Sequence, residues 1–186
     1  MKTEYKRFYE EPPNLDGLIE ALEDPHCPVD VVVDVLTEKI SWYDWMGENG
    51  YADAYPYCII VTACLANRQL SGNHLSRAVK WFLENFEISL EESGCQFNGE
   101  MLDEHGINDL FKQEALSAKQ LDEIARMLIR SDDAYFESFK SSETLGGPPP
   151  DEVFGLILAH LNTSEKTKVM VKKFLITRNE KGYPYQ

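Results

Sequence analysis

Apolar residues at helical spacing are the feature that most limits the folds open to this chain, and they are clearest in residues 117–130. Ser117 and Gln120 have the spacing of a capping box, in which two side chains bind backbone N–H groups at the start of a helix. A shorter apolar segment, residues 107–116, precedes them. This part of the chain is therefore predicted to form a helix, a tight turn and a capped helix. The apolar residues of the second helix recur three and four positions apart, as a buried helix face requires: Leu121, Ile124, Ala125, Leu128 and Ile129.

The same arrangement recurs along the chain. The predicted second helices of four such pairs start at Pro28, Ser71, Ser117 and Thr163, which are 43, 46 and 46 residues apart. A period of about 40 to 47 residues, with two helices in each repeat, is typical of HEAT and armadillo arrays. Over residues 15–178 the chain resembles such arrays. The resemblance implies an all-α fold in which about four helical hairpins form a short stack with a curved binding face.

Two long inserts, residues 88–106 and 131–150, depart from a compact repeat and favour an irregular, compact helical bundle instead. Both arrangements are all-α, and the sequence pattern does not choose between them. Within the second insert, residues 131–142 are predicted to form a separate short helix that links its neighbours. We predict three segments: an N-terminal arm over residues 1–14, a single all-α domain over 15–178 and a C-terminal tail over 179–186.

The net charge is strongly negative and unevenly distributed. It is -14 for the whole chain, and residues 1–60 hold thirteen acidic and four basic side chains, whereas residues 121–186 hold ten and nine. An acidic surface repels the phosphates of nucleic acids and of anionic lipids, so we expect no direct binding to nucleic acid and none to a membrane. The sequence shows no signal peptide and no apolar run as long as a membrane span, and we expect a cytoplasmic protein.

Residue types that support catalysis or metal binding are scattered. No phosphate-binding loop and no hydrolase motif is present, so we expect no cofactor, no metal and no catalytic residue. The local cluster of two carboxylates and an imidazole, together with His26 or His160, makes a metal-dependent hydrolase the alternative. This cluster consists of Asp103, Glu104 and His105. The cysteines form no CxxC pair and are expected to be buried, reduced thiols: Cys27, Cys58, Cys64 and Cys95.

Three carboxylates form one stripe on a helix predicted over residues 29–46. Asp30, Asp34 and Glu38 are four residues apart, which places them on the same side of that helix. Like charges at this spacing repel, so the stripe does not stabilise the helix itself. It suits a surface that binds a basic partner, and it is also typical of an ordinary solvated helix face.

An aromatic and acidic segment follows this stripe. Trp and Tyr bury large areas while keeping a polar group, which is typical of interface hot spots and also of the end of a helical stack. The predicted partner-binding residues of the segment are Trp42, Asp44, Trp45, Glu48, Tyr51, Asp53 and Tyr55. By contrast, the last helix is basic from Lys166 to Arg178, and its charges are expected to be solvated.

Together these patterns predict a non-enzymatic protein that binds another protein. Acidic surfaces steer association with basic sites, so the preferred function is an inhibitor or immunity-type antagonist of a basic partner, such as a nucleic-acid-binding protein. Two other interpretations stay open beside the hydrolase. One is an adaptor or scaffold that uses a helical-repeat face, and the other is an anti-defence protein that mimics DNA. The sequence does not predict an oligomeric state.

Overall fold

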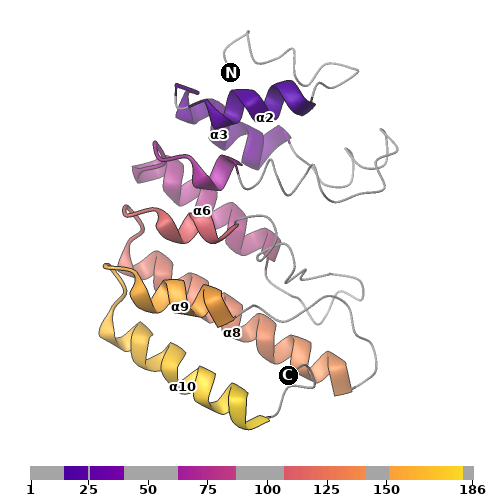
Figure 1. Cartoon of the computed structure of the whole chain (residues 1–186), viewed down its shortest axis with the longest axis vertical. Coiled ribbons are helices and arrows are strands. Elements are labelled where there is room, and N and C mark those ends of the chain that lie inside the picture. The colour runs from indigo at the N-terminus through magenta and orange to yellow at the C-terminus, as the bar shows by residue number, and fades with distance from the viewer. Residues whose placement is uncertain (1–14, 25, 40–62, 87–106, 141–150, 182–186) are drawn as a thin grey trace. The chain divides into compact units, whose positions relative to one another are not determined.

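The computed structural model describes residues 15–24, 26–39, 63–86, 107–140 and 151–181, and no strand occurs among them (Figure 1). The predicted all-α fold class is confirmed. The helices are α2 (Leu15–Glu23), α3 (Val29–Asp34), the π-helical turn η1 (Val35–Lys39), α6 (Gly72–Phe86), the 3-10 helix η2 (Ile107–Lys112), α8 (Ala118–Lys140), α9 (Asp151–Ala159) and α10 (Glu165–Lys181). Among the described residues, every helix is too short or too polar to cross a membrane.

The chain divides into two compact units. The first consists of Met1–Trp81 and His105–Ala115, and the second of Phe82–Glu104 and Leu116–Gln186. Both units bury apolar side chains of their helices, among them Leu18, Val32 and Leu75 in the first and Leu121, Phe154 and Val171 in the second. The prediction of a single domain over residues 15–178 is not tested by this division.

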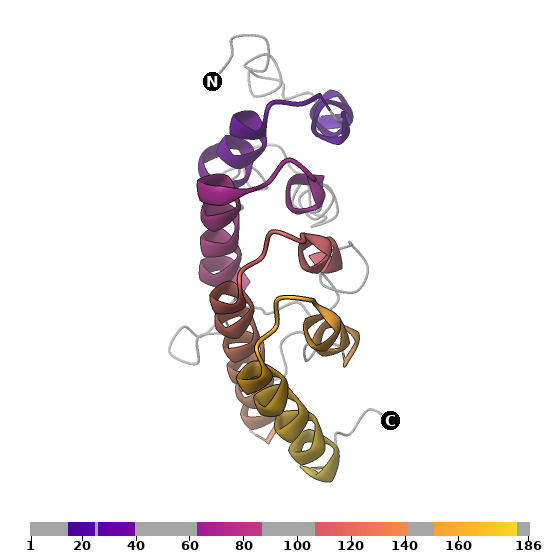
Figure 2. The ribbon, with the colours of Figure 1, turned by 90° about the vertical axis from the view of Figure 1, so that its left-hand side faces the viewer.

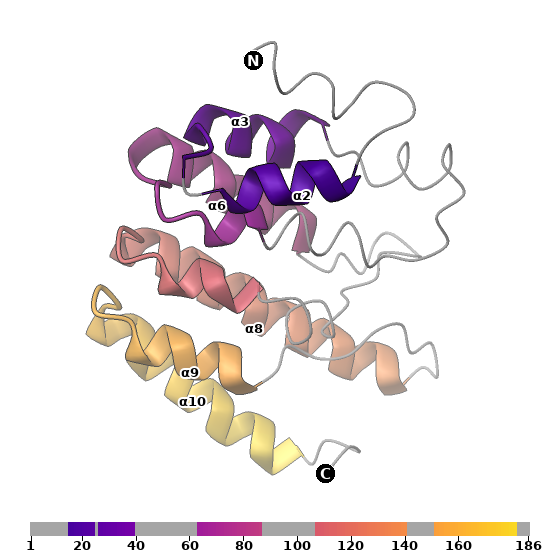
Figure 3. The same ribbon diagram turned by 45° about the horizontal axis from the view of Figure 1, so that its top comes forward.

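In the first unit, a tight turn joins α2 to α3 (Figure 3). The backbone N–H of Cys27 donates to the carbonyl of Asp24, and the N–H of Val31 donates to that of Pro28, both at 2.8 Å. Pro28 has the extended backbone of a helix N-cap, with φ -60° and ψ 129°. The predicted helix start at this proline is therefore confirmed. Proline suits the start of a helix because the first N–H groups of a helix have no partner within it, and proline has no N–H.

The helix that follows Pro28 is buried on most sides. Val32 and Val33 are completely inaccessible to solvent, and the chain continues without a break from α3 into η1. The Thr37 hydroxyl donates to the carbonyl of Val33 at 2.8 Å, four residues earlier. The valine-rich residues 29–35, whose composition would also suit a buried strand, are therefore helical. The predicted continuation from residue 40 to 46 lies outside the described residues.

A second turn leads into α6. The side chain of Asn67 accepts the N–H of Gln69 at 2.9 Å, and the buried amide of Gln113 donates to the carbonyls of Leu65 and Asn67 at 2.8 and 3.0 Å. Residues 63–66 are helical, and the two bonds from Gln113 satisfy carbonyls that the end of this helix leaves without partners. Gly72 then begins α6 with φ +50°, a left-handed conformation that disfavours side chains with a Cβ.

The predicted capping box is present at the start of α8, in the second unit. The N–H of Gln120 donates to the Ser117 hydroxyl at 3.3 Å, and the N–H of Ser117 donates to the Gln120 side chain at 2.9 Å. The prediction of a separate helix over 131–142 is wrong, because α8 runs unbroken from Ala118 to Lys140. Ser131 and Asp132, at the predicted break, are 0% and 1% exposed, so packing continues through them.

The turn between α9 and α10 is closed by two hydroxyls. The Thr163 hydroxyl donates to the carbonyl of Ile157 at 2.6 Å, and the Ser164 hydroxyl accepts the N–H of Thr167 at 3.1 Å. Ser164 rather than Thr163 is therefore the N-cap of α10. The helix extends to Lys181, three residues into the predicted C-terminal tail.

Helices α8, α9 and α10 contact one another and form the core of the second unit. Figure 2 shows α9 on one side of α8 and α10, and Figure 1 shows α9 and α10 side by side. Phe154 of α9 lies 5.1 Å from Phe174 of α10 between ring centroids. In each unit, side chains also bond residues 40 to 48 positions away in the sequence. The resemblance to HEAT arrays stays a prediction.

Candidate functional site

Two members of the predicted acidic stripe, Asp30 and Asp34, lie beside the start of α6 in the first unit. Asp30 and His74 are joined by a contact of 2.6 Å between Oδ1 and Nε2. The carboxylate side chain nevertheless stays 78% exposed, against 34% for the imidazole. Asp30 is thus positioned by its neighbour while most of its surface faces solvent, as a residue that binds a partner must be.

Asp34 has a more internal role. Its Oδ1 is 3.6 Å from Nη2 of Arg77, and its side chain is only 22% exposed. The same Arg77 nitrogen donates to the Thr37 hydroxyl at 3.0 Å. A partly buried carboxylate beside an arginine contributes to the packing of α3 and η1 on α6, so Asp30 and Asp34 differ in what they offer a partner. The side chain of Glu38 lies outside the described residues.

The aromatic and acidic segment predicted to bind a partner also lies outside the described residues. Its members keep their status as predictions: Trp42, Asp44, Trp45, Glu48, Tyr51, Asp53 and Tyr55. The predicted catalytic alternative, Asp103, Glu104 and His105, is outside them too. Of the partner-binding residues predicted from sequence, the structure therefore places the side chains of Asp30 and Asp34.

The described histidines are engaged in local contacts. His26 donates its backbone N–H to the Asp24 carboxylate at 2.8 Å and places its ring Nδ1 3.1 Å from the same oxygen. The backbone bond, more than the ring, lowers the pKa of Asp24. The ring of His160 accepts the N–H of Asn162 at 3.1 Å. Within the described ranges, no group of three His, Cys, Asp or Glu side chains is arranged to hold a metal ion.

The two described cysteines, Cys27 and Cys64, are buried and free. Burial, and to a smaller extent the charge of Cys27, raises the pKa of the Cys64 thiol. A thiol that resists ionisation is a poor nucleophile and a poor metal ligand, because the thiolate is the reactive form. The predicted structural role fits both of these cysteines.

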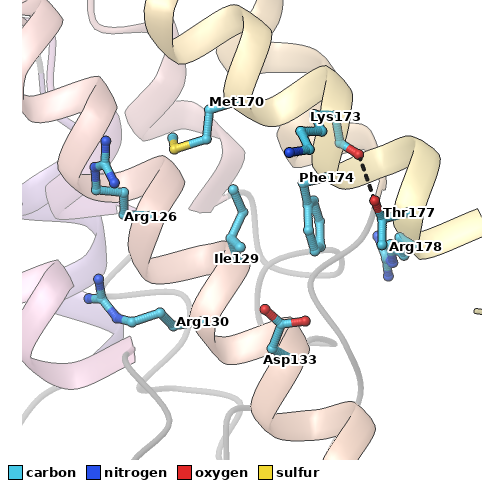
Figure 4. Close-up of a pocket in the computed structure, with 9 residues that line it drawn as sticks. All are labelled: Arg126, Ile129, Arg130, Asp133, Met170, Lys173, Phe174, Thr177 and Arg178. Atoms are coloured by element: carbon cyan, nitrogen blue, oxygen red, sulfur yellow. Dashed lines mark hydrogen bonds between the residues drawn. The ribbon is translucent and has the colours of Figure 1, made fainter.

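A groove between α8 and α10, in the second unit, was not predicted from the sequence (Figure 4). It is open to solvent and has a volume of about 480 Å³. Figure 4 shows Ile129 of α8 facing Met170 and Phe174 of α10 across it. The remaining residues of its lining are mainly charged: Arg126, Arg130, Asp133, Lys173, Thr177 and Arg178.

One end of the groove is fixed by Asp122 of α8. Its carboxylate accepts hydrogen bonds from Arg126 at 2.8 Å and from the buried Thr167 hydroxyl of α10 at 2.9 Å. The hydrogen bond from Arg126, followed by that from Thr167, lowers the pKa of Asp122, whereas burial opposes this shift. The carboxylate joins the two helices and holds Arg126 at the rim.

The other end is fixed by Arg178, which was expected to be solvated. This expectation is wrong, because Arg178 is only 8% exposed. Its Nε lies 3.1 Å from the buried Asp132, its Nη1 bonds to Asp151, and its guanidinium carbon lies 5.9 Å from the centre of the Phe154 ring. A cation at this depth needs counter-ions, and two aspartates far apart in the sequence supply them.

The groove combines fixed cations with an apolar lining, which is suited to binding and orienting a ligand. The groove is formed by α8 and α10, and the residues that face each other across it are about 45 positions apart in the sequence. Helical spacing places the apolar residues Met170 and Phe174 on one side of their helix. It does not show that this side faces Ile129. The sequence signal that could have found the groove is the pairing of basic and apolar residues at equivalent turns of the two helices.

Comparison with known protein families, curated proteins and solved structures finds no match to this chain.

Proposed function

We propose that the chain binds another protein and acts as an inhibitor or immunity-type antagonist of a basic partner. The partner contacts the acidic surface of the N-terminal third, where acidic side chains outnumber basic ones by thirteen to four. Such an excess of charge raises the rate of encounter with a basic surface and disfavours acidic competitors.

The observation that supports this proposal best is the geometry of Asp30. Its contact with His74 orients the carboxylate, and 78% of the side chain still faces solvent. A positioned charge loses less conformational entropy on binding than a mobile one. Glu20, on α2 of the same unit, is exposed as well and adds to the negative surface.

A capture experiment tests the proposal. The tagged chain is incubated with extract of the source cells at about 0.05 M and about 0.5 M salt, a range over which screening between exposed charges becomes strong. A basic protein should be captured at low salt and released at high salt, and its dissociation constant should rise steeply with ionic strength. Capture that is indifferent to salt, or of acidic partners alone, would contradict the proposal.

A matched pair of variants locates the contact. Neutralising Glu20 and Asp30 together, as Glu20→Gln and Asp30→Asn, should weaken binding of the captured protein several-fold. The control neutralises two exposed carboxylates of the second unit, as Glu152→Gln and Glu180→Gln, and changes the net charge equally. The proposal fails at this site if the control pair weakens binding as much, because the effect would then follow overall charge.

A further inference from the structure

The last helix, α10, carries apolar side chains on two opposite sides. Val171 is completely inaccessible to solvent, whereas Val169 and Ile176 are 64% and 60% exposed. Val169 and Ile176 are about two turns apart, so they lie together on the side of the helix that faces away from Val171. Apolar residues on both sides are typical of a helix that is covered on both sides.

The helix α8 has an equivalent side. Counted from the serine that caps each helix, Asp122 of α8 and Val169 of α10 are both fifth, and Ile129 of α8 and Ile176 of α10 are both twelfth. Residues at equal positions lie on equivalent sides of the two helices, because every helical turn contains about 3.6 residues.

On α8, this side is covered by α10. Asp122 accepts a hydrogen bond from the Thr167 hydroxyl of α10 at 2.9 Å, and Ile129 faces Met170 and Phe174 of α10 (Figure 4). On α10, the side chains at the equivalent positions are exposed. This side of α10 therefore suits a further helix that packs on α10 as α10 packs on α8.

The open side of α10 is basic. Lys172 and Lys173 are exposed, and helical spacing places them on opposite flanks of the two exposed apolar residues. The acids of α10 stand at its two ends, where Glu165 is paired with Lys168 at 3.0 Å and Glu180 lies beyond the last exposed apolar residue. Lys172 does not line the groove between α8 and α10, and it is not among the cations that the aspartates of α8 and α9 hold.

A second copy of this chain is a poor occupant of this side. If two α10 helices packed antiparallel about a two-fold axis, Val169 would lie near Ile176 of the second copy, but Lys172 and Lys173 would also be brought together. Like charges enclosed in an interface are unfavourable. Among the described residues, the remaining exposed large apolar side chain is Leu161, which lies in the turn before α10 and not on the acidic first unit.

We propose that the exposed side of α10 binds an amphipathic, acidic helix of a partner protein. The apolar residues of that helix recur three, four and seven positions apart and pack on Val169 and Ile176. Carboxylates on both flanks of its apolar stripe contact Lys172 and Lys173. This site lies in the second unit, so it does not rest on the proposed antagonism of a basic partner by the first unit.

A titration with designed peptides tests this site. The probe is a fluorescein-labelled peptide of about 20 residues, long enough to form a helix, with leucines along one side, glutamates on both flanks and alanine elsewhere. Its fluorescence anisotropy is followed as the full chain is added, and we expect saturable binding. One control peptide has the same composition with the leucines spread around the helix, and another has lysine in place of every glutamate.

Both control peptides should bind at least about tenfold more weakly than the probe. A control peptide that binds as tightly as the probe would overturn the proposal, because the amphipathic pattern or the acidic charge would then not be recognised. Absence of saturable binding of the probe up to about 1 mM chain, a concentration at which even a weak complex forms, would overturn it as well.

Two exposed aliphatic residues provide the matched variants. Ile176→Asp and Leu161→Asp each remove an exposed aliphatic side chain and add one negative charge, but Leu161 lies in the turn before α10. Ile176→Asp should raise the dissociation constant of the probe about tenfold or more, because it places a carboxylate in the apolar contact. Leu161→Asp should change it less than about twofold. Equal effects of the two variants overturn the proposal.

A third measurement does not depend on any variant. Carbon-13 methyl spectra of the full chain should show the resonances of Val169 and Ile176 shifting with the same saturation curve as the anisotropy. The resonances of Ile129 and Met170, which lie in the groove, should shift less. Larger shifts at Ile129 and Met170 would place the probe in the groove and overturn the proposal.

Sedimentation equilibrium of the chain alone, at the concentrations of the titration, tests the competing occupant. We expect no self-association that depends on α10. Self-association that Ile176→Asp abolishes and Leu161→Asp leaves unchanged would identify a second copy of the chain as the occupant and overturn the proposal.

Discussion

The buried guanidinium of Arg178 stabilises the second unit, although the sequence analysis expected this side chain to be solvated. Asp132 is 1% exposed, and a carboxylate at that depth is costly without a counter-ion. Arg178 supplies that counter-ion and also contacts Asp151 and the ring of Phe154. One side chain of α10 therefore joins α8 and α9.

Removing this guanidinium should destabilise the chain strongly. Arg178→Met removes this counter-ion from the buried Asp132 carboxylate, and we expect a loss of about 3 kcal/mol or more in the free energy of unfolding. Urea denaturation followed by circular dichroism measures the change. Combining Arg178→Met with Asp132→Asn should recover part of the loss, whereas Lys172→Met on the exposed side should cost less than about 0.5 kcal/mol. An Arg178→Met loss as small as that of Lys172→Met would contradict the role of Arg178.

Asp122 should make stability depend on acid. Its hydrogen bonds from Arg126 and Thr167 lower its pKa in the folded state below the ordinary value of 3.8. A lowered pKa means that the stabilisation is fully present above the ordinary pKa and disappears as pH falls through the folded one. Asp122→Asn should thus be less stable than the parent chain near neutral pH, and the difference should shrink below about pH 4.

Urea denaturation at a series of pH values measures this difference. The comparison variant is Glu123→Gln on the same helix, which should cost less than about 0.5 kcal/mol near neutral pH, because the Glu123 carboxylate is paired with Lys119 at 3.6 Å on the surface. A constant difference between Asp122→Asn and the parent chain from pH 7 to about pH 3 would show that the charge of Asp122 does not contribute.

At the scale of helices, two glycines with different backbone conformations allow the effects of a glycine-to-alanine substitution on stability to be compared. Gly72 begins α6 with φ +50°, whereas Gly155 lies within α9, and a Cβ would meet no atom within 4 Å at either position. Only the backbone then decides the effect of alanine. We expect Gly155→Ala to stabilise the chain by about 0.5 to 1 kcal/mol and Gly72→Ala to destabilise it by about 1 to 2 kcal/mol. Thermal unfolding of both variants measures these changes, and an equal shift in the same direction would contradict the assigned conformations.

The continuity of α8 can be tested by proline. Asp133 is exposed and lies within the unbroken helix Ala118–Lys140. Asp133→Pro should cost about 3 kcal/mol, because it removes a hydrogen bond to the preceding turn and its ring clashes with that turn. Asp133→Ala is the control for loss of the carboxylate. If the helix instead began near Ser131, proline would fall in a first turn and cost little, and an unfolding midpoint like that of the alanine variant would show this.

The sequence predicts helix starts better than helix ends. Pro28 and the box of Ser117 and Gln120 act within one turn of the chain, so local spacing reveals them. The course of α8 past Ser131 depends on its contacts with α9 and α10, which are distant in sequence. The same reason hides the groove, since the approach of Ile129 to Met170 and Phe174 follows from packing of helices and not from either helix alone.

At the scale of the whole molecule, charge is the property from which the proposed function follows. The sequence already shows the excess of acid in the N-terminal third, and the structure adds which of two carboxylates on α3 is available. Asp34 is partly buried beside Arg77, whereas Asp30 is mostly exposed beside His74. Composition cannot make that distinction, because it depends on where α6 passes along α3.

The most direct test of the proposed function is a map of amide chemical shifts on adding the basic protein captured from cell extract. We expect the largest changes on α2, α3 and the start of α6, around Glu20, Asp30 and His74, and we expect them to diminish at about 0.5 M salt through screening. Changes confined to α8 and α10, or a map that salt leaves unaltered, would contradict recognition of a basic partner by the acidic surface.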